Sequence, residues 1–107
     1  MALFRCGGGA AEDTYVIGYA AISQGTSKSF TTSRAYKKFR VAWGNSAGEI
    51  TINGTTYNSG TGTKLYEEGT TPHVLYEEFN VPIASGETVV FKYTGGGAIP
   101  AWIFGIA

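Results

Sequence analysis

The sequence has little of the chemistry from which metal sites and reactive nucleophiles are built. Its 107 residues include one cysteine, Cys6, and one histidine, His73. A single cysteine excludes an intramolecular disulfide and a zinc site built on cysteines. Asp13 is the only aspartate, so the chain has no Asp-rich calcium loop. These absences predict a protein without a metal or other cofactor.

An excess of charge and a long apolar run are also missing. Eight basic and eight acidic residues give a net charge of zero, whereas a nucleic-acid binder normally carries a basic excess. Nucleic acid is therefore not an expected partner, and weak repulsion between copies suits a protein that assembles. No segment reaches the length of a membrane helix, and residues 1–13 lack the apolar core of a signal peptide. We expect no membrane insertion and synthesis in the cytoplasm.

What the chain does contain is the pattern of short strands. Phe39, Val41 and Trp43 fall on one side of an extended chain and the basic residues 38 and 40 on the other, as in a half-buried strand. Asn53-Gly54 follows another alternating segment and is a strong hairpin signal. Turn residues separate about eight such strands, and no helical period of useful length occurs. The fold predicted for residues 14–107 is a single antiparallel β-sandwich, jelly-roll-like or otherwise Greek key, after a glycine-rich arm at residues 1–13.

Three segments carry more specific expectations. Residues 15–22 are apolar on both faces, which favours a strand covered on both sides. In the strand expected at 73–81, Glu77 and Glu78 occupy both faces, which a bulge or an edge position would explain. Residues 98–107 carry no charged side chain. That strand should be central in the sandwich or buried against another subunit, because an exposed one would aggregate.

The glutamate pairs at 67–68 and 77–78 are the nearest approach to a catalytic motif. Two carboxylates can act as acid and base at a glycosidic bond. Adjacent strand residues point to opposite faces, however, so neither pair can act as a unit. A Cys6–His73 pair would require the arm to fold back. We interpret these glutamates as solvated or ion-paired edge residues, and the chain as not an enzyme.

Charged residues also cluster by sign along the chain. Four of the eight basic residues lie within seven positions, and four of the eight acids within twelve. Cross-strand pairing within one chain is the favoured interpretation, and charge complementarity between neighbouring subunits is the alternative. The residues concerned are Arg34, Lys37, Lys38 and Arg40, and Glu67, Glu68, Glu77 and Glu78.

Trp43 continues a core face, and the aromatic side of the last strand is typical of either core or interface. Trp102, Phe104 and Ile106 share one side of the last strand, and the arm carries Leu3 and Phe4. We predict these five as partner-contact residues. Aromatic rings also stack on sugars, and the candidate residues for glycan binding are Tyr57, Tyr66 and Tyr76.

The opening MALFRCGGG, the segment Tyr36-Lys37-Lys38, the hairpin GEITING at 48–54 and SGETV at 85–89 together resemble small proteins encoded among the tail genes of phages and prophages of Gram-positive bacteria. The resemblance supplies no catalytic residues. It implies a virion structural protein of the tail, tip, baseplate or fibre region, or a capsid decoration protein, that contacts its own copies and other virion proteins. The alternative is a carbohydrate-binding module that recognises the host surface.

Overall fold

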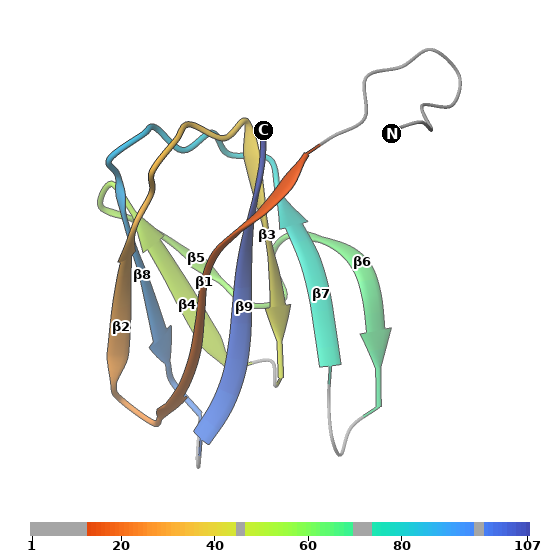
Figure 1. The fold of residues 1–107 in the computed structure, drawn as a ribbon. Helices are drawn as coiled ribbons and strands as arrows, with labels where there is room; N and C mark the ends of the chain where they lie inside the picture. The colour runs from red at the N-terminus through yellow and green to blue at the C-terminus, as the bar shows by residue number, and fades with distance from the viewer. Residues whose placement is uncertain (1–12, 45–46, 70–73, 96–97) are drawn as a thin grey trace.

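The computed structural model describes residues 13–44, 47–69, 74–95 and 98–107, and every regular element within these ranges is a β-strand (Figure 1). The predicted arm therefore lies outside the described residues, except for Asp13. No helix that could cross a bilayer is found in these ranges. The strands are β1 (Thr14–Ser23), β2 (Ser27–Thr31), β3 (Lys38–Trp43), β4 (Gly48–Ile52), β5 (Thr55–Asn58), β6 (Thr63–Glu68), β7 (Val74–Phe79), β8 (Thr88–Tyr93) and β9 (Ala98–Ile106).

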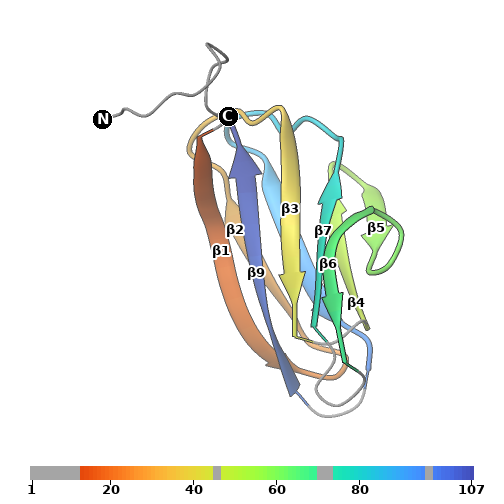
Figure 2. The same cartoon turned by 90° about the vertical axis from the view of Figure 1, so that its right-hand side faces the viewer.

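The strands form two antiparallel sheets that lie face to face (Figure 2). One sheet has the order β1-β9-β3-β7-β6 and the other the order β2-β8-β4-β5. The antiparallel pairs enclose one another along the chain: β1·β9 is the outermost, followed inward by β2·β8, β3·β7 and β4·β5. This nested pairing is the jelly-roll arrangement. β6 extends the larger sheet beyond β7. The predicted antiparallel sandwich is confirmed, with nine strands in the described ranges rather than about eight.

The core lies between the sheets and follows the period of two in the sequence. Phe39, Val41 and Trp43 are at most 1% exposed, as the alternation in β3 predicts. The facing sheet contributes Phe91 and Tyr93 from β8, both 0% exposed. A β-strand turns successive side chains to opposite faces, so each strand supplies one apolar side to the same interior.

The β4–β5 hairpin turns at Asn53-Gly54, as expected. Asn53 has φ 51° and Gly54 φ 79°, and a two-residue type I′ turn requires positive φ at both positions. Asn53 is the one non-glycine residue with positive φ in the described ranges. The turn therefore has the backbone conformation that the Asn-Gly pair predicts.

Two expectations about strand environment are wrong or incomplete. β1 is an edge strand whose outward side chains face solvent, with Val16 57% and Tyr19 41% exposed, so it is not covered on both sides. β7 is not at an edge, because it pairs with both β3 and β6. β9 is central in its sheet between β1 and β3, as predicted, but its outward-facing Trp102 is 43% exposed.

Candidate contact surface on the five-stranded sheet

The two outer faces of the sandwich differ in chemistry. On the outer side of the four-stranded sheet, the middle of the ladder is mostly hydroxyl-bearing, which suits a face in water. All the large hydrophobic side chains that are markedly exposed in the described ranges lie on the five-stranded sheet instead. The four-stranded face presents Ser29, Val90, Thr51 and Thr56 in register. The exposed hydrophobic residues are Val16, Tyr19, Leu65, Tyr66, Val74 and Trp102.

Strand register places five residues in a line across the sheet, one on each strand, and four of them are aromatic. Each residue of the line is directly opposite the next in the antiparallel ladders. At about 4.8 Å between strands the line is about 19 Å long. We refer to it as the outer aromatic row, and its members, from β1 to β6, are Tyr19, Trp102, Ala42, Tyr76 and Tyr66.

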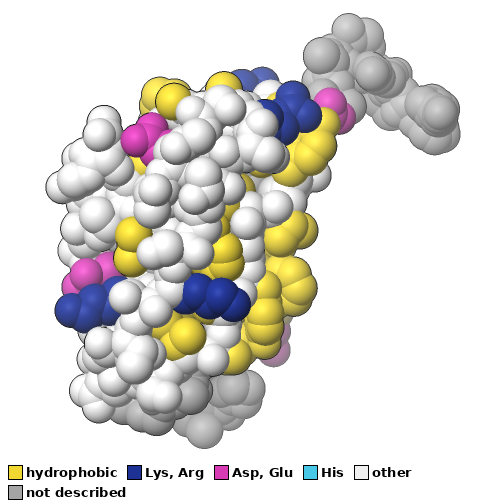
Figure 3. All heavy atoms as spheres, turned by 60° about the vertical axis from the view of Figure 1, so that its left-hand side comes forward, with side chains coloured by type: hydrophobic (Ala, Val, Ile, Leu, Met, Phe, Trp, Pro, Cys, Tyr) yellow, Lys and Arg dark blue, Asp and Glu magenta, His cyan; other side chains and the backbone are white. Residues whose placement is uncertain are grey.

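The rings form a continuous surface rather than isolated exposed groups. Ring centroids lie 4.4 Å apart for Tyr19 and Trp102, and 6.4 Å apart for Trp102 and Phe104. Phe104 of β9 and Tyr76 of β7 meet edge to face at 6.2 Å and 89°, a favourable arrangement for aromatic pairs. They can meet because the strand between them, β3, has the small residue Ala42 in the row. In Figure 3 the face that points toward the viewer in Figure 1 has turned to the right. Hydrophobic side chains line this right-hand margin.

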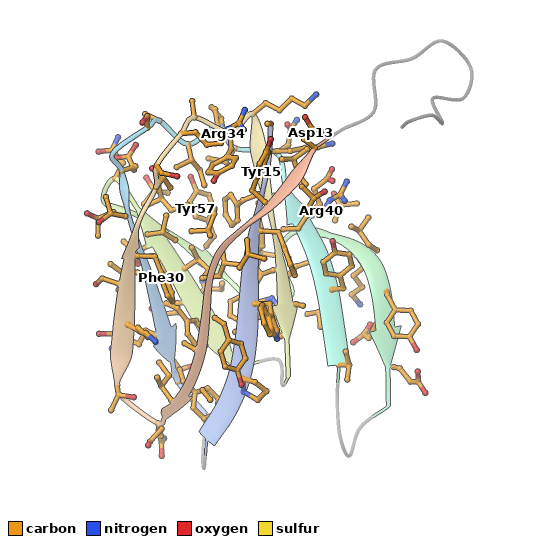
Figure 4. The ribbon with its side chains drawn as sticks, in the orientation of Figure 1. Asp13, Tyr15, Phe30, Arg34, Arg40 and Tyr57 are labelled. Carbon is orange, nitrogen blue, oxygen red and sulfur yellow. The ribbon has the colours of Figure 1, made fainter. Side chains whose placement is uncertain are left out.

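A charged group borders the aromatic row on β3 and β7. Arg40 donates to Glu78 at 2.9 Å, and the Lys38 ammonium lies 3.4 Å from the same carboxylate. Figure 4 labels Arg40 on the β7 side of β3. The hydrogen bond from Arg40 lowers the pKa of Glu78 below its usual value; partial burial opposes this shift and Lys38 adds to it. The predicted cross-strand pairing of the basic and acidic clusters is confirmed for these residues.

The predicted contact residues are separated by the structure. Trp102 is 43% exposed and Phe104 is half-buried, so both belong to the outer aromatic face. Ile106 shares their side by alternation but is 0% exposed, and it offers no contact surface. Leu3 and Phe4 lie outside the described residues.

The predicted glycan-binding tyrosines are likewise divided. Tyr66, 52% exposed, is directly opposite Tyr76 in the β6–β7 ladder. Tyr57 lies on β5 of the other sheet and packs against Phe39 and Phe79, with centroids 5.6 and 5.8 Å away (Figure 4). It supports the core instead of the outer face.

Sequence reasoning missed Tyr19 as a surface aromatic. Its strand was expected to be covered on both sides, and nothing local marks which side remains open. Only the pairing of Tyr19 with Trp102, from the opposite end of the chain, brings it into the row.

The adjacent glutamates of β7 face opposite ways, as the strand period requires. Glu77 is 0% exposed and accepts hydrogen bonds from Trp43 Nε1 at 2.5 Å, Gly60 N–H at 2.9 Å and Gly62 N–H at 2.8 Å. The interpretation of Glu77 as a solvated or ion-paired edge residue is therefore wrong. Neutral donors satisfy its carboxylate, and they tie the loop between β5 and β6 to the core tryptophan.

The other pair also has structural partners. Glu67 forms an ion pair with Lys64 at 2.7 Å, and Glu68 accepts a hydrogen bond from the Tyr66 hydroxyl. Within the described ranges there is no pocket and no group of three or more His, Cys, Asp or Glu side chains able to hold a metal ion. Cys6 and His73 fall outside those ranges.

Fold and surface together define a jelly-roll β-sandwich with one polar and one aromatic outer face. Comparison of the chain with protein-family models, with curated proteins and with solved structures finds no match.

Proposed function

We propose that this chain is a non-enzymatic structural protein of a phage virion, located in the tail, tip, baseplate or fibre region or decorating the capsid. It works by holding protein surfaces together. The observation that carries the proposal is the aromatic outer face of the five-stranded sheet, the sheet whose strands carry all the markedly exposed large hydrophobic residues of the described ranges. The resemblance of the sequence to small phage tail-region proteins supplies the virion setting.

The composition of this face supports protein contact. Tyrosine, tryptophan, phenylalanine and arginine are enriched where protein interfaces are fully buried, and Trp, Tyr and Arg dominate binding energy in alanine scans. The face presents Tyr19, Trp102, Phe104 and Tyr76 with Arg40 beside them. Among the described residues, the outer face of the four-stranded sheet has no comparable group of exposed aromatic side chains. Exposed aromatic residues are therefore specific to one face of this sandwich and are not spread over its whole surface.

The proposal is tested on virions of the phage or induced prophage that carries the gene. Purified particles are analysed by mass spectrometry and by immunogold labelling with antibody against the recombinant chain. We expect the protein in washed particles at a copy number that is constant from preparation to preparation. Its absence from particles, while it is abundant in the lysate, would overturn the proposal.

A second function, binding of host-surface carbohydrate, is favoured by one observation. Tyr66 and Tyr76 are directly opposite neighbours across two strands, and Tyr66 is 52% exposed. Aromatic rings that combine an apolar face with a hydroxyl suit the mixed chemistry of a sugar.

The test is binding of the purified protein to host cell-wall polysaccharides, with Tyr66→Ala and Tyr76→Ala as variants. Tyr57→Phe is the matched control, because Tyr57 packs on the core. Binding that both alanine variants lose and the control keeps would support this second function. No binding to any host polysaccharide would refute it.

A further inference from the structure

We propose that the outer face of the five-stranded sheet pairs with the same face of a second copy of this chain, about a two-fold axis that runs along the strands between β3 and β7. This inference rests on the proposed function and names the partner of its contact face. Pairing of identical faces closes after two copies, and such isologous dimers are the commonest oligomers.

The size of the face agrees with a small, reversible dimer. The proposed axis superposes four of the five strands, β9, β3, β7 and β6. Four strands about 4.8 Å apart, with about six residues of about 3.3 Å each, cover roughly 400 Å². Two copies would then bury about 800 Å² in total, the size of a weak, transient contact and far below that of an obligate dimer. The outer face of a sheet can pack on that of another sheet, since sheets pack face to face about 10 Å apart with their strands nearly aligned.

Charge complementarity sets the position of the axis. Arg40 and Glu78 are directly opposite each other in the β3–β7 ladder. A two-fold axis between these strands places Arg40 of each copy over Glu78 of the other. The four charges then alternate in sign, so each existing ion pair gains an opposite charge from the second copy. An axis along β3 itself would bring the two Arg40 side chains together, which like-charge repulsion disfavours.

The same axis also matches large side chains with small ones. In the outer aromatic row it sets Ala42 of one copy beneath Tyr76 of the other, because these residues are opposite neighbours on β3 and β7. One strand further out on each side, Trp102 of β9 faces Tyr66 of β6 in the second copy. The exposed parts of both rings are removed from water by this contact.

The first experiment measures solution mass by light scattering over about a hundredfold range of concentration, because a small interface should dissociate on dilution. The wild-type mass should fall from that of a dimer to that of a monomer on dilution. Trp102→Ala should weaken association at least about tenfold. Thr56→Arg, on the polar outer face, is the matched control and should associate like wild type.

The second experiment exchanges charges between copies. Arg40→Glu and Glu78→Arg each place like charges within the chain and between copies, so each variant alone should be monomeric. Mixing the two restores an opposite pair only across the interface, and a heterodimer should form. A structural role of the ion pair within one chain predicts no such rescue. Circular dichroism confirms beforehand that each variant is folded.

Two results would overturn the pairing: a wild-type chain that stays monomeric over the whole range, or charge variants whose mixture remains monomeric although both are folded. A monomer that binds another virion protein or a polysaccharide through Trp102 would assign the face to that partner and also refute the pairing. Detection of the protein in purified virions is independent of all these outcomes. Failure of the pairing is thus distinguishable from failure of the proposed function.

Discussion

The buried carboxylate of Glu77 allows a sharp prediction, because its neighbour Glu78 is a control of the same residue type on the same strand. Glu77 is 0% exposed and accepts three hydrogen bonds from neutral donors. Glu78 points outward, its side chain is 20% exposed, and it pairs with Arg40 and Lys38. We predict that Glu77→Gln destabilises the fold much more than Glu78→Gln.

The magnitude follows from the geometry. Glutamine at position 77 can keep its carbonyl oxygen where Oε2 now accepts from Trp43 and Gly60, but its amide nitrogen then faces the Gly62 N–H. A buried donor left without an acceptor costs about 1–3 kcal/mol, and the two remaining bonds lose the strengthening that a charged acceptor gives. The smaller desolvation cost of a neutral amide offsets part of this loss. We expect a net loss of about 2 kcal/mol for Glu77→Gln, against about 0.2–1 kcal/mol for an ion pair near the surface such as that of Glu78.

The assay is urea unfolding at neutral pH, followed by the fluorescence of Trp43 and Trp102 in dilute protein so that association does not contribute. Thermal midpoints provide a second measure, since about 1 kcal/mol shifts the midpoint of a domain near this size by about 4–8 °C. The reasoning would be refuted by a Glu77→Gln variant within about 0.5 kcal/mol of wild type. Equal losses in the two variants would refute it as well.

Other substitutions test the remaining features. The folded-state pKa of Glu78 is lowered from its usual value near 4.5. Its ion pair therefore stabilises the fold above that pH, and the stabilisation is lost as the pH falls through the lower folded-state pKa. The difference in unfolding free energy between wild type and Glu78→Gln should shrink in acid, as urea titrations at several pH values would show. Gly54 has φ 79°, and a methyl group added there would lie in open space. Gly54→Ala should therefore lower the free energy of unfolding by about 1–2 kcal/mol through backbone strain alone. An unchanged free energy of unfolding would contradict the turn assignment. A methyl group at Gly48 would meet the buried ring of Trp43. Gly48→Ala should therefore lower the free energy of unfolding by about 1–3 kcal/mol through overpacking and change the near-ultraviolet circular dichroism. An unchanged spectrum and an unchanged stability would show that the ring can move.

Features that depend on neighbouring residues could be predicted from the sequence. The alternation of Phe39, Val41 and Trp43 identified a strand and its buried side, because the two faces of a strand are set by the backbone. Asn53-Gly54 identified a hairpin, because few residues adopt positive φ without strain. The all-β class and the pairing of Arg40 with a glutamate of the acidic cluster were accessible for similar reasons.

What covers each face of a strand could not be predicted from local sequence patterns. A period of two shows which side chains share a face, but not whether another sheet, a loop or solvent covers that face. Glu77 was therefore expected at the surface, although the loop between β5 and β6 brings two backbone N–H groups to its buried carboxylate. Ile106 was expected beside Trp102 at a contact surface, although it is fully buried.

The sequence by itself determined the strands, the inward side of β3 and the tight turn, since these follow from the local backbone and from side-chain alternation. Only the tertiary structure decided that Tyr19, Trp102, Tyr76 and Tyr66 form one row on one face. They come from strands at both ends and in the middle of the chain, and the jelly-roll order alone makes them neighbours. The aromatic contact face is thus a product of strand pairing over long sequence distances, which no local pattern encodes.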